Sequence, residues 1–364
     1  MPTERRLMRG SHVVGEAAVL AGCRYYFGYP ITPQNELPEY LSAKMLEVGG
    51  TFVQAESEIA AINMVLGAAA AGGRAMTSSS SPGIALKQEA ISYMCGQELP
   101  AVIINMMRGG PGLGNIAPSA ADYFQVTRGG GNGDYHTPVL APASCQELAE
   151  LTFTAFDVAD KYRTPVMIVG DGLLGQVMEP VVFPDPIDPK TLQSKDYILD
   201  GCAGREPRAI YSLLLGDKGE LYYNNLKLQD KYDRIRASEV LFEDYLIDGA
   251  EIIVVAYGTA SRIARAAVDE VRNAGLNAGL FRPITLWPFP TKQLRGLIDR
   301  GSKVAVFELS MGQMVEDVVL SVLERAEIFL YGIAGGLIPT PEQLEAFIRS
   351  VAAGDGKVGR RIQL

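Results

Sequence analysis

The chain has 364 residues, 48% of them hydrophobic, and is long enough to bury full-sized cores in two or three domains. Its formal net charge of −9 at pH 7 would repel a phosphate backbone, so nucleic acid is not an expected partner. No apolar stretch reaches the length of a membrane span, and we expect a cytoplasmic protein with no membrane association.

The first 178 residues alternate short apolar runs with longer segments of helical period. Strand–helix alternation of this kind predicts a doubly wound parallel sheet. The expected strands are 25–28, 74–78, 101–107 and 165–169, and the expected helices are 11–21, 56–71, 82–95 and 146–162.

The pattern breaks between residues 179 and 249, where four prolines precede mixed polar and aromatic residues without a sustained period. We interpret this stretch as a connecting segment. Alternation then resumes through residues 250–364 and predicts a second, smaller α/β domain. Its expected strands are 252–256, 280–282, 304–308 and 328–331, and its expected helices are 262–274, 314–324 and 342–352.

The four cysteines, at positions 23, 95, 145 and 202, are far apart in the sequence. Iron–sulfur clusters need grouped thiolates, so we expect this chain to hold none. Scattered thiols in an acidic, cytosolic-looking chain also make disulfides improbable, and each cysteine is expected to be a small buried hydrophobe.

Three segments carry side chains suited to chemistry. Thr32 follows a predicted strand between Pro30 and Pro33, which would fix its hydroxyl at the end of a sheet where ligands bind. Glu58 opens an alanine-rich helix, and Arg108 ends a buried strand before two glycines. Each has an ordinary alternative: a proline-flanked turn, a carboxylate favoured by the helix dipole, and a surface ion pair.

These segments together resemble a known family. Tyr-Pro-Ile-Thr-Pro at 29–33, Gln-Ala-Glu-Ser-Glu-Ile at 54–59 and Arg-Gly-Gly-Pro at 108–111 are similar to the alpha subunit of the 2-oxoacid:ferredoxin oxidoreductases, which include the 2-oxoisovalerate and 2-oxoglutarate enzymes. The resemblance implies a thiamine diphosphate pyrimidine-binding domain at 1–178, a connecting segment at 179–249 and a transketolase C-terminal-like α/β domain at 250–364. The last domain is expected to serve subunit association.

The resemblance also implies roles for individual residues. Glu58 matches the glutamate whose carboxyl group activates the cofactor by favouring the imino form of its aminopyrimidine. Pro30 and Ser80 would also contact the cofactor, while Thr32 and Arg108 would bind the 2-oxoacid carboxylate. The loop at 77–83 departs from the family pattern, because Ser81 stands where a glycine is common.

The other half of the cofactor site is expected elsewhere. Gly170-Asp171-Gly172 imitates the start of a magnesium and diphosphate motif, but no asparagine follows at the required spacing. We therefore expect Asp171 to be a turn residue and a beta subunit to hold the diphosphate and Mg²⁺. Iron–sulfur clusters would also lie on partner subunits, with gamma and ferredoxin-like delta subunits expected, coenzyme A as cosubstrate and ferredoxin as electron acceptor.

The expected reaction is oxidative decarboxylation of a 2-oxoacid to an acyl-CoA with reduction of ferredoxin. The segments 108–115 and 129–135 are closer to the 2-oxoisovalerate type, which favours a branched-chain substrate such as 3-methyl-2-oxobutanoate. The alternatives are a 2-oxoglutarate synthase subunit, a non-catalytic scaffold with a thiamine fold, and a split transketolase. A scaffold would not need Glu58, Thr32 and Arg108 together, and a transketolase usually has more than two histidines.

Overall fold

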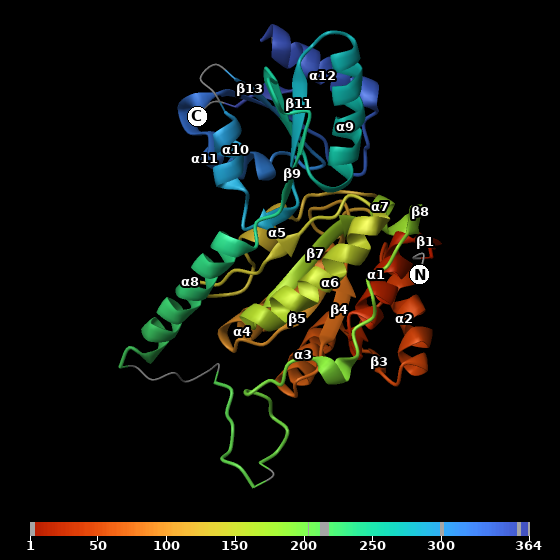
Figure 1. Cartoon of the computed structure of the whole chain (residues 1–364), viewed down its shortest axis with the longest axis vertical. Coiled ribbons are helices and arrows are strands. Elements are labelled where there is room, and N and C mark those ends of the chain that lie inside the picture. The colour runs from red at the N-terminus through yellow and green to blue at the C-terminus, as the bar shows by residue number, and fades with distance from the viewer. Residues whose placement is uncertain (1–3, 203, 212–217, 299–301, 355–357, 363–364) are drawn as a thin grey trace.

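The computed structural model describes residues 4–202, 204–211, 218–298, 302–354 and 358–362. They build two α/β units, each around one sheet, with a long helix projecting to one side (Figure 1). No helix among these residues is long and apolar enough to span a membrane. Residues 212–217 of the expected connecting segment lie outside the described residues.

The first sheet has seven strands in the order β12-β6-β7-β5-β4-β2-β3. Six of them are parallel, and only β12, which comes from the later part of the chain, runs antiparallel to its neighbour β6. The strands are β2 (Tyr25–Gly28), β3 (Thr51–Gln54), β4 (Ala75–Ser79), β5 (Ala101–Met107), β6 (Val139–Leu140), β7 (Pro165–Asp171) and β12 (Thr285–Trp287).

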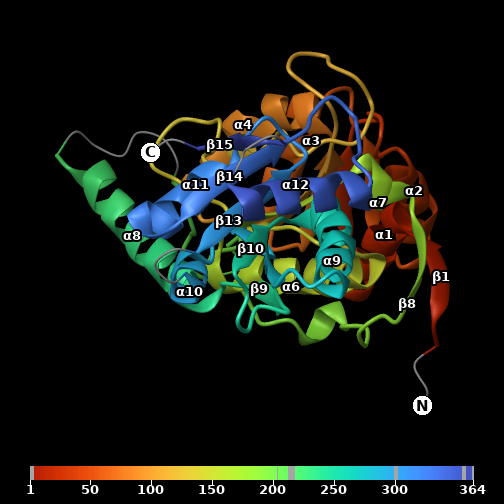
Figure 2. The ribbon, with the colours of Figure 1, turned by 90° about the horizontal axis from the view of Figure 1, so that it is seen from above.

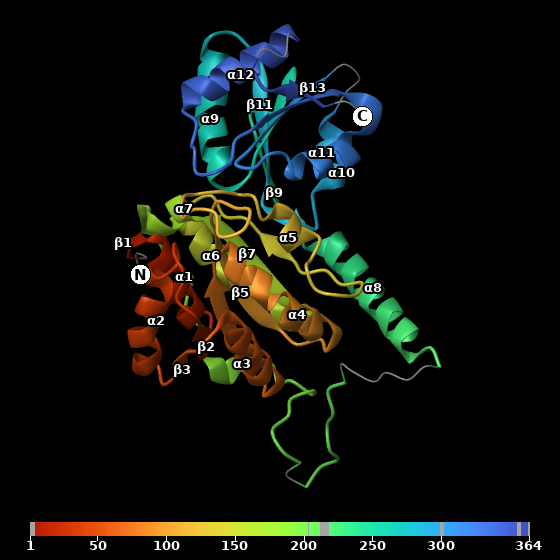
Figure 3. The ribbon, with the colours of Figure 1, turned by 180° about the vertical axis from the view of Figure 1, so that it is seen from behind.

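Helices cover both faces of this sheet, as a doubly wound fold requires. One layer contains α1 (Gly10–Leu20), α2 (Glu36–Glu47) and α6 (Cys145–Tyr162), which pack against one another. The other layer contains α3 (Glu58–Ala70) and α4 (Ser81–Gly96), seen in front in Figure 3. Short elements complete the unit: α5 (Tyr123–Thr127), α7 (Gly172–Gln176), the 3₁₀ turn Pro189–Thr191, and the ribbon of β1 (Arg6–Arg9) with β8 (Met178–Val181).

The second sheet has six strands in the order β15-β14-β13-β10-β11-β9, with antiparallel strands at both edges. Helix α9 packs against α12, and α10 packs against α11 (Figure 2). The elements are β9 (Phe242–Tyr245), β10 (Ile252–Val255), α9 (Gly258–Asn273), β11 (Ala278–Pro283), α10 (Thr291–Leu297), β13 (Lys303–Glu308), α11 (Met314–Val322), the 3₁₀ turn Leu323–Arg325, β14 (Glu327–Gly332), α12 (Pro341–Ala353) and β15 (Arg360–Arg361).

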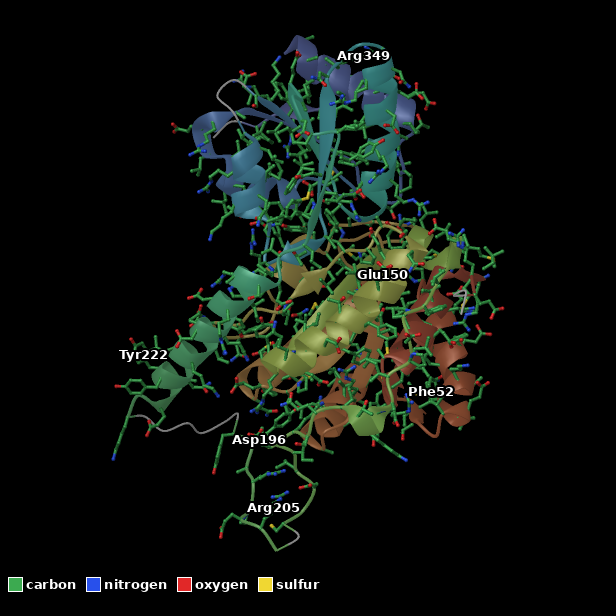
Figure 4. All side chains as sticks on the ribbon, viewed as in Figure 1. Phe52, Glu150, Asp196, Arg205, Tyr222 and Arg349 are labelled. Atoms are coloured by element: carbon green, nitrogen blue, oxygen red, sulfur yellow. The ribbon has the colours of Figure 1, made fainter. Side chains whose placement is uncertain are left out.

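The fold class expected from the sequence is confirmed, and every expected strand and helix is present within a few residues. The connecting segment differs from the expectation, because it contains the 19-residue helix α8 (Glu220–Ser238). Only Leu228, Lys231, Tyr232 and Ile235 of this helix are buried, so most of it shows no apolar stripe. Tyr222, at the outer end of α8 in Figure 4, is 62% exposed.

The two sheets are joined by buried polar contacts. Arg282 on β11 is 4% exposed and donates two hydrogen bonds to the Glu147 carboxylate of α6, at 2.8 and 2.5 Å, and one to Glu243, at 2.7 Å. Tyr123 of α5 donates to Asp317 of α11, which also pairs with Arg128 at 2.8 Å. These contacts set the second sheet above the carboxyl ends of the parallel strands of the first.

Candidate active site

The candidate site lies where the winding of the first sheet reverses. After β2 the chain passes through α2 to β3 on one side, whereas after β4 it passes through α4 to β5 on the other. Ligands of open α/β sheets bind in the crevice outside the carboxyl ends of the strands at such a switch point. The loops after β2, β4 and β5 carry Thr32, Ser80 and Arg108, and α3 begins beside them with Glu58.

Glu58 is the first residue of α3 and is 7% exposed. Ser57 caps the helix by accepting a hydrogen bond from the Ala60 amide at 3.2 Å, so Glu58 is not needed as the cap. Glu56 precedes the helix and is exposed. Among the described residues none donates a hydrogen bond to the Glu58 carboxylate, which leaves a buried acceptor for a ligand.

Helix α4 approaches Glu58 closely at Gly83. A Cβ atom at this glycine would collide with the Ser79 hydroxyl and lie 2.8 Å from Oε1 of Glu58. The Pro-Gly pair in the first turn of α4 therefore allows the starts of α3 and α4 and the end of β4 to meet. One turn further along, the fully buried Lys87 donates to the Glu58 carbonyl oxygen at 3.2 Å.

The end of β4 presents unpaired hydroxyl groups. Ser80 is fully buried, and its hydroxyl has no hydrogen-bond partner among the described residues; the same holds for the Thr77 and Ser79 hydroxyls. Buried polar atoms are nearly always paired, so three orphans in four residues indicate a place where a polar ligand is received. Pro30, in contrast, is exposed on the loop after β2.

Ser81 has a structural role that its departure from the family pattern did not suggest. Its hydroxyl donates to Asp122 at 2.6 Å and accepts from the Arg108 amide at 3.0 Å, while its own amide donates to Asn105 at 3.1 Å. Asn105 also donates to Asp122 at 2.9 Å, which closes a ring of hydrogen bonds between the start of α4, β5 and the residue before α5. Burial raises the pKa of the Asp122 carboxyl group, against the lowering effect of these donors.

Arg108 ends β5 and is 6% exposed. Its guanidinium donates to the Thr32 carbonyl oxygen at 2.9 Å and to the Leu113 carbonyl oxygen at 3.2 Å, while its Nε–H is buried without a partner among the described residues. The structure thus brings Arg108 and Thr32 together, through the Thr32 backbone, and leaves the Thr32 side chain exposed. A buried cation with a free donor suits an anionic ligand.

The loop after β2 is held by hydrogen bonds among buried residues that the sequence analysis did not single out. Gln34 and Ser78 are both fully buried, and the Ser78 hydroxyl bonds to Gln34 and, at 2.7 Å, to the Tyr26 hydroxyl. Asn105 is the only polar residue in the run 101–107, and a lone polar residue in an apolar strand is a signal of a site residue that the sequence did contain. Lys87, inside an amphipathic helix, offered none.

Residues interpreted as structural have structural contacts. Asp171 caps α7 by accepting from the amides of Leu173 and Leu174 at 2.9 and 3.0 Å, and burial raises its pKa. His136 stacks on Trp287 with ring centroids 4.6 Å apart, and Trp287 is 7% exposed. Glu308 is fully buried and accepts from three amides at the start of α11, so its carboxylate is satisfied within the second unit.

The expectation for the cysteines holds at three of four positions. Cys23, Cys95 and Cys145 are buried, and desolvation raises the pKa of each to about 12. Cys202 is exposed, which corrects the expectation that all four are buried.

The architecture and the site together define a thiamine-type α/β protein, with orphaned polar groups at the switch point of its first sheet. Comparison with known proteins specifies the family. Residues 16–203 match the model described as pyruvate flavodoxin/ferredoxin oxidoreductase, thiamine diP-binding, and residues 250–344 match pyruvate:ferredoxin oxidoreductase core domain II. The chain belongs to the 2-oxoacid:ferredoxin oxidoreductases, as an alpha-type subunit.

Two curated relatives extend over nearly the whole chain. The ketoisovalerate oxidoreductase subunit VorB of Methanothermobacter thermautotrophicus is 49% identical over 95% of this chain and 98% of its own length. The 2-oxoglutarate synthase subunit KorA of the same organism is 34% identical over 94% of this chain and 97% of its own.

Solved structures show the same fold. The 2-oxoglutarate:ferredoxin oxidoreductase from Magnetococcus marinus, with 2-oxoglutarate, coenzyme A and succinyl-CoA bound, has a TM-score of 0.85 and 26% identity; the match covers 96% of this chain and 65% of that chain. A split-gene transketolase, in an inactive beta4 tetramer, has a TM-score of 0.58 at 12% identity and shares the fold alone.

Proposed function

We propose that this chain is the alpha subunit of a branched-chain 2-oxoacid:ferredoxin oxidoreductase, which converts a substrate such as 3-methyl-2-oxobutanoate to its acyl-CoA and reduces ferredoxin. The observation that carries the site assignment is the carboxylate of the buried residue Glu58, which receives no hydrogen bond from the described residues and lies against Gly83 in the first turn of α4. The 49% identical relative named for ketoisovalerate supports the substrate class.

The residues present fit the pyrimidine half of thiamine diphosphate. Glu58 would bond to the far ring nitrogen and favour the tautomer that removes the proton from the reactive carbon. The unpaired Ser80 hydroxyl offers a polar contact at the ring edge, and Pro30 an apolar one. When bound, the cofactor supplies the nucleophilic carbon and the electron sink for decarboxylation.

Arg108 is proposed to bind the carboxylate next to the ketone, and its free Nε–H provides the donor that this contact needs. Thr32 would form the neighbouring wall of the substrate pocket, because its carbonyl oxygen already holds the guanidinium at 2.9 Å. Among the described residues around the site the other buried cation is Lys87 of α4, which donates to the Glu58 carbonyl oxygen. A second carboxylate, as in 2-oxoglutarate, would therefore need a cation from elsewhere or lie unpaired at a cost of several kcal/mol.

The diphosphate and Mg²⁺ are assigned to a beta subunit, because Asp171 of the Gly-Asp-Gly segment is occupied as a helix cap. Iron–sulfur clusters, coenzyme A binding and the gamma and ferredoxin-like delta subunits are likewise proposed for the assembled complex. Exposed apolar side chains on two loops that touch at the rim support a partner there: Leu113 is 81% exposed, Ile116 62% and Leu337 67%.

The alternative substrate is 2-oxoglutarate, favoured by the KorA relatives and by the 2-oxoglutarate bound in the Magnetococcus enzyme. The test is an assay of the assembled complex with coenzyme A and a viologen acceptor on a panel of 2-oxoacids. We expect kcat/KM to be highest for branched-chain substrates. A preference for 2-oxoglutarate of tenfold or more would overturn the substrate assignment and leave the reaction type standing.

A further inference from the structure

Lys87 is a buried cation that the assigned roles do not use. It lies on α4, its side chain is completely buried, and its Nζ bonds to the Glu58 carbonyl oxygen at 3.2 Å. This carbonyl is its only hydrogen-bond partner among the residues the structure describes. Lysines are rarely buried to this degree unless paired, so the position requires a reason.

The charge of Lys87 is balanced by the same residue. Burial disfavours its ammonium form, and the carboxylate of Glu58 is the charge that opposes this effect. Lys87 and Glu58 come from α4 and α3, which pack side by side in Figure 3. The packing of this helix pair therefore brings the Lys87 ammonium group to the backbone of Glu58.

The position of the Glu58 carboxylate depends on the helix turn that carries it. No donor among the described residues bonds to this carboxylate, and Gly83 allows α4 to approach it closely. The Lys87 bond to the Glu58 backbone also fixes the first turn of α3, from which the carboxylate projects.

We propose that Lys87 is a positioning residue for Glu58: its ammonium group donates to the Glu58 carbonyl oxygen and so anchors the helix turn from which the carboxylate projects. The inference rests on the proposed role of Glu58. It assigns to Lys87 an action through Glu58, with no contact to substrate.

The test compares complexes purified with their partner subunits, carrying wild-type chain, Lys87→Met or Lys87→Gln. The readouts are deuterium exchange at the reactive carbon of the bound cofactor and hydrogen exchange of the amides in the first turn of α3. Loss of the anchor in Lys87→Met should slow exchange at the reactive carbon by about tenfold to a hundredfold, because the Glu58 carboxylate is no longer held in place while the cofactor still binds. Exchange of the α3 amides should become faster.

Lys87→Gln keeps a hydrogen-bond donor at this position and should bring both exchange rates back toward those of the wild type. Lys231→Met is the matched control: Lys231 of α8 is 3% exposed but pairs with Glu98 at 3.4 Å, away from the site. Lys231→Met should leave both exchange rates unchanged.

Unchanged exchange rates in Lys87→Met would overturn the proposal, as would an equal change in Lys231→Met. A Glu58→Gln complex that retains half its activity would instead refute the proposed role of Glu58, so the two failures are distinguishable.

Discussion

Burial of Lys87 should make the stability of the fold depend on pH in a defined window. Its pKa falls from 10.5 to about 8 because burial penalises the ammonium form, and the Glu58 charge offsets only part of this effect. Between these two pH values the unfolded chain still binds a proton that the folded chain has released. Stability therefore rises with pH across this window. Below the window the cost of burying the ammonium group is constant, and above it the cost is gone, so Lys87 adds no further pH dependence there.

The magnitude follows from the same two values. A difference of about 2.5 pKa units corresponds to about 3 kcal/mol, an upper figure for a side chain that solvent does not reach. Lys87→Met does not titrate, so the free energy of unfolding of the wild-type chain relative to this variant should increase by up to about 3 kcal/mol from pH 8 to 10.5.

The assay is denaturant unfolding of both proteins at several pH values, supplemented by hydrogen exchange of the amides of α3 and α4. Other groups titrate in this range and cancel in the difference between the two proteins. Lys292→Met, on an exposed position of α10, should show no such trend. A difference between wild type and Lys87→Met that stays within about 0.5 kcal/mol, the level of surface substitutions, would refute the reasoning.

Four further predictions concern the site and its partners. Glu58→Gln should retain cofactor in the complex but slow proton exchange at its reactive carbon by about a hundred- to ten-thousandfold, measured by deuterium exchange; half-retained activity would exclude the residue. Ser81→Gly should raise KM for the 2-oxoacid more than it lowers kcat, because Arg108 loses the acceptor of its amide; an unchanged KM would contradict this. Calorimetric titration of the isolated chain with thiamine diphosphate and Mg²⁺ should be nearly flat until the beta subunit is added, and micromolar binding by the chain alone would argue against a divided site. Metal analysis of the isolated chain should find no iron, whereas stoichiometric iron and sulfide would refute that expectation.

The sequence predicted the parts of the fold that have a strong period. Buried parallel strands such as β5 and β7 are continuous apolar runs, and their helices end at glycines or begin at caps. Three of the missed elements have weak patterns for physical reasons. Helix α8 is mostly exposed, β3 is an edge strand whose Thr51 and Gln54 are exposed, and β12 is a three-residue strand that pairs with β6 from a distant part of the chain.

The residues of the site also fall into two groups: those that a local sequence motif reveals and those that only the folded chain brings together. Glu58, Thr32, Ser80 and Arg108 were found because each stands in a local motif at the end of a strand or the start of a helix. Asn105 and Asp122 were missed because their role is a contact across 17 residues. Lys87 was missed because it lies 29 residues from Glu58, and only the packing of α3 on α4 brings the two together.

The contacts of Ser81 show why a departure from a family pattern can strengthen an assignment. A glycine there would suit the φ of +20° that Ser81 adopts, so the serine is retained against a conformational cost. Compared with a glycine, the serine provides a hydroxyl group that accepts from the Arg108 amide at 3.0 Å and donates to Asp122 at 2.6 Å. The loop that faces the cofactor half-site is thereby tied to the cation proposed for the substrate. A change at Ser81 should consequently affect substrate binding before it affects the fold.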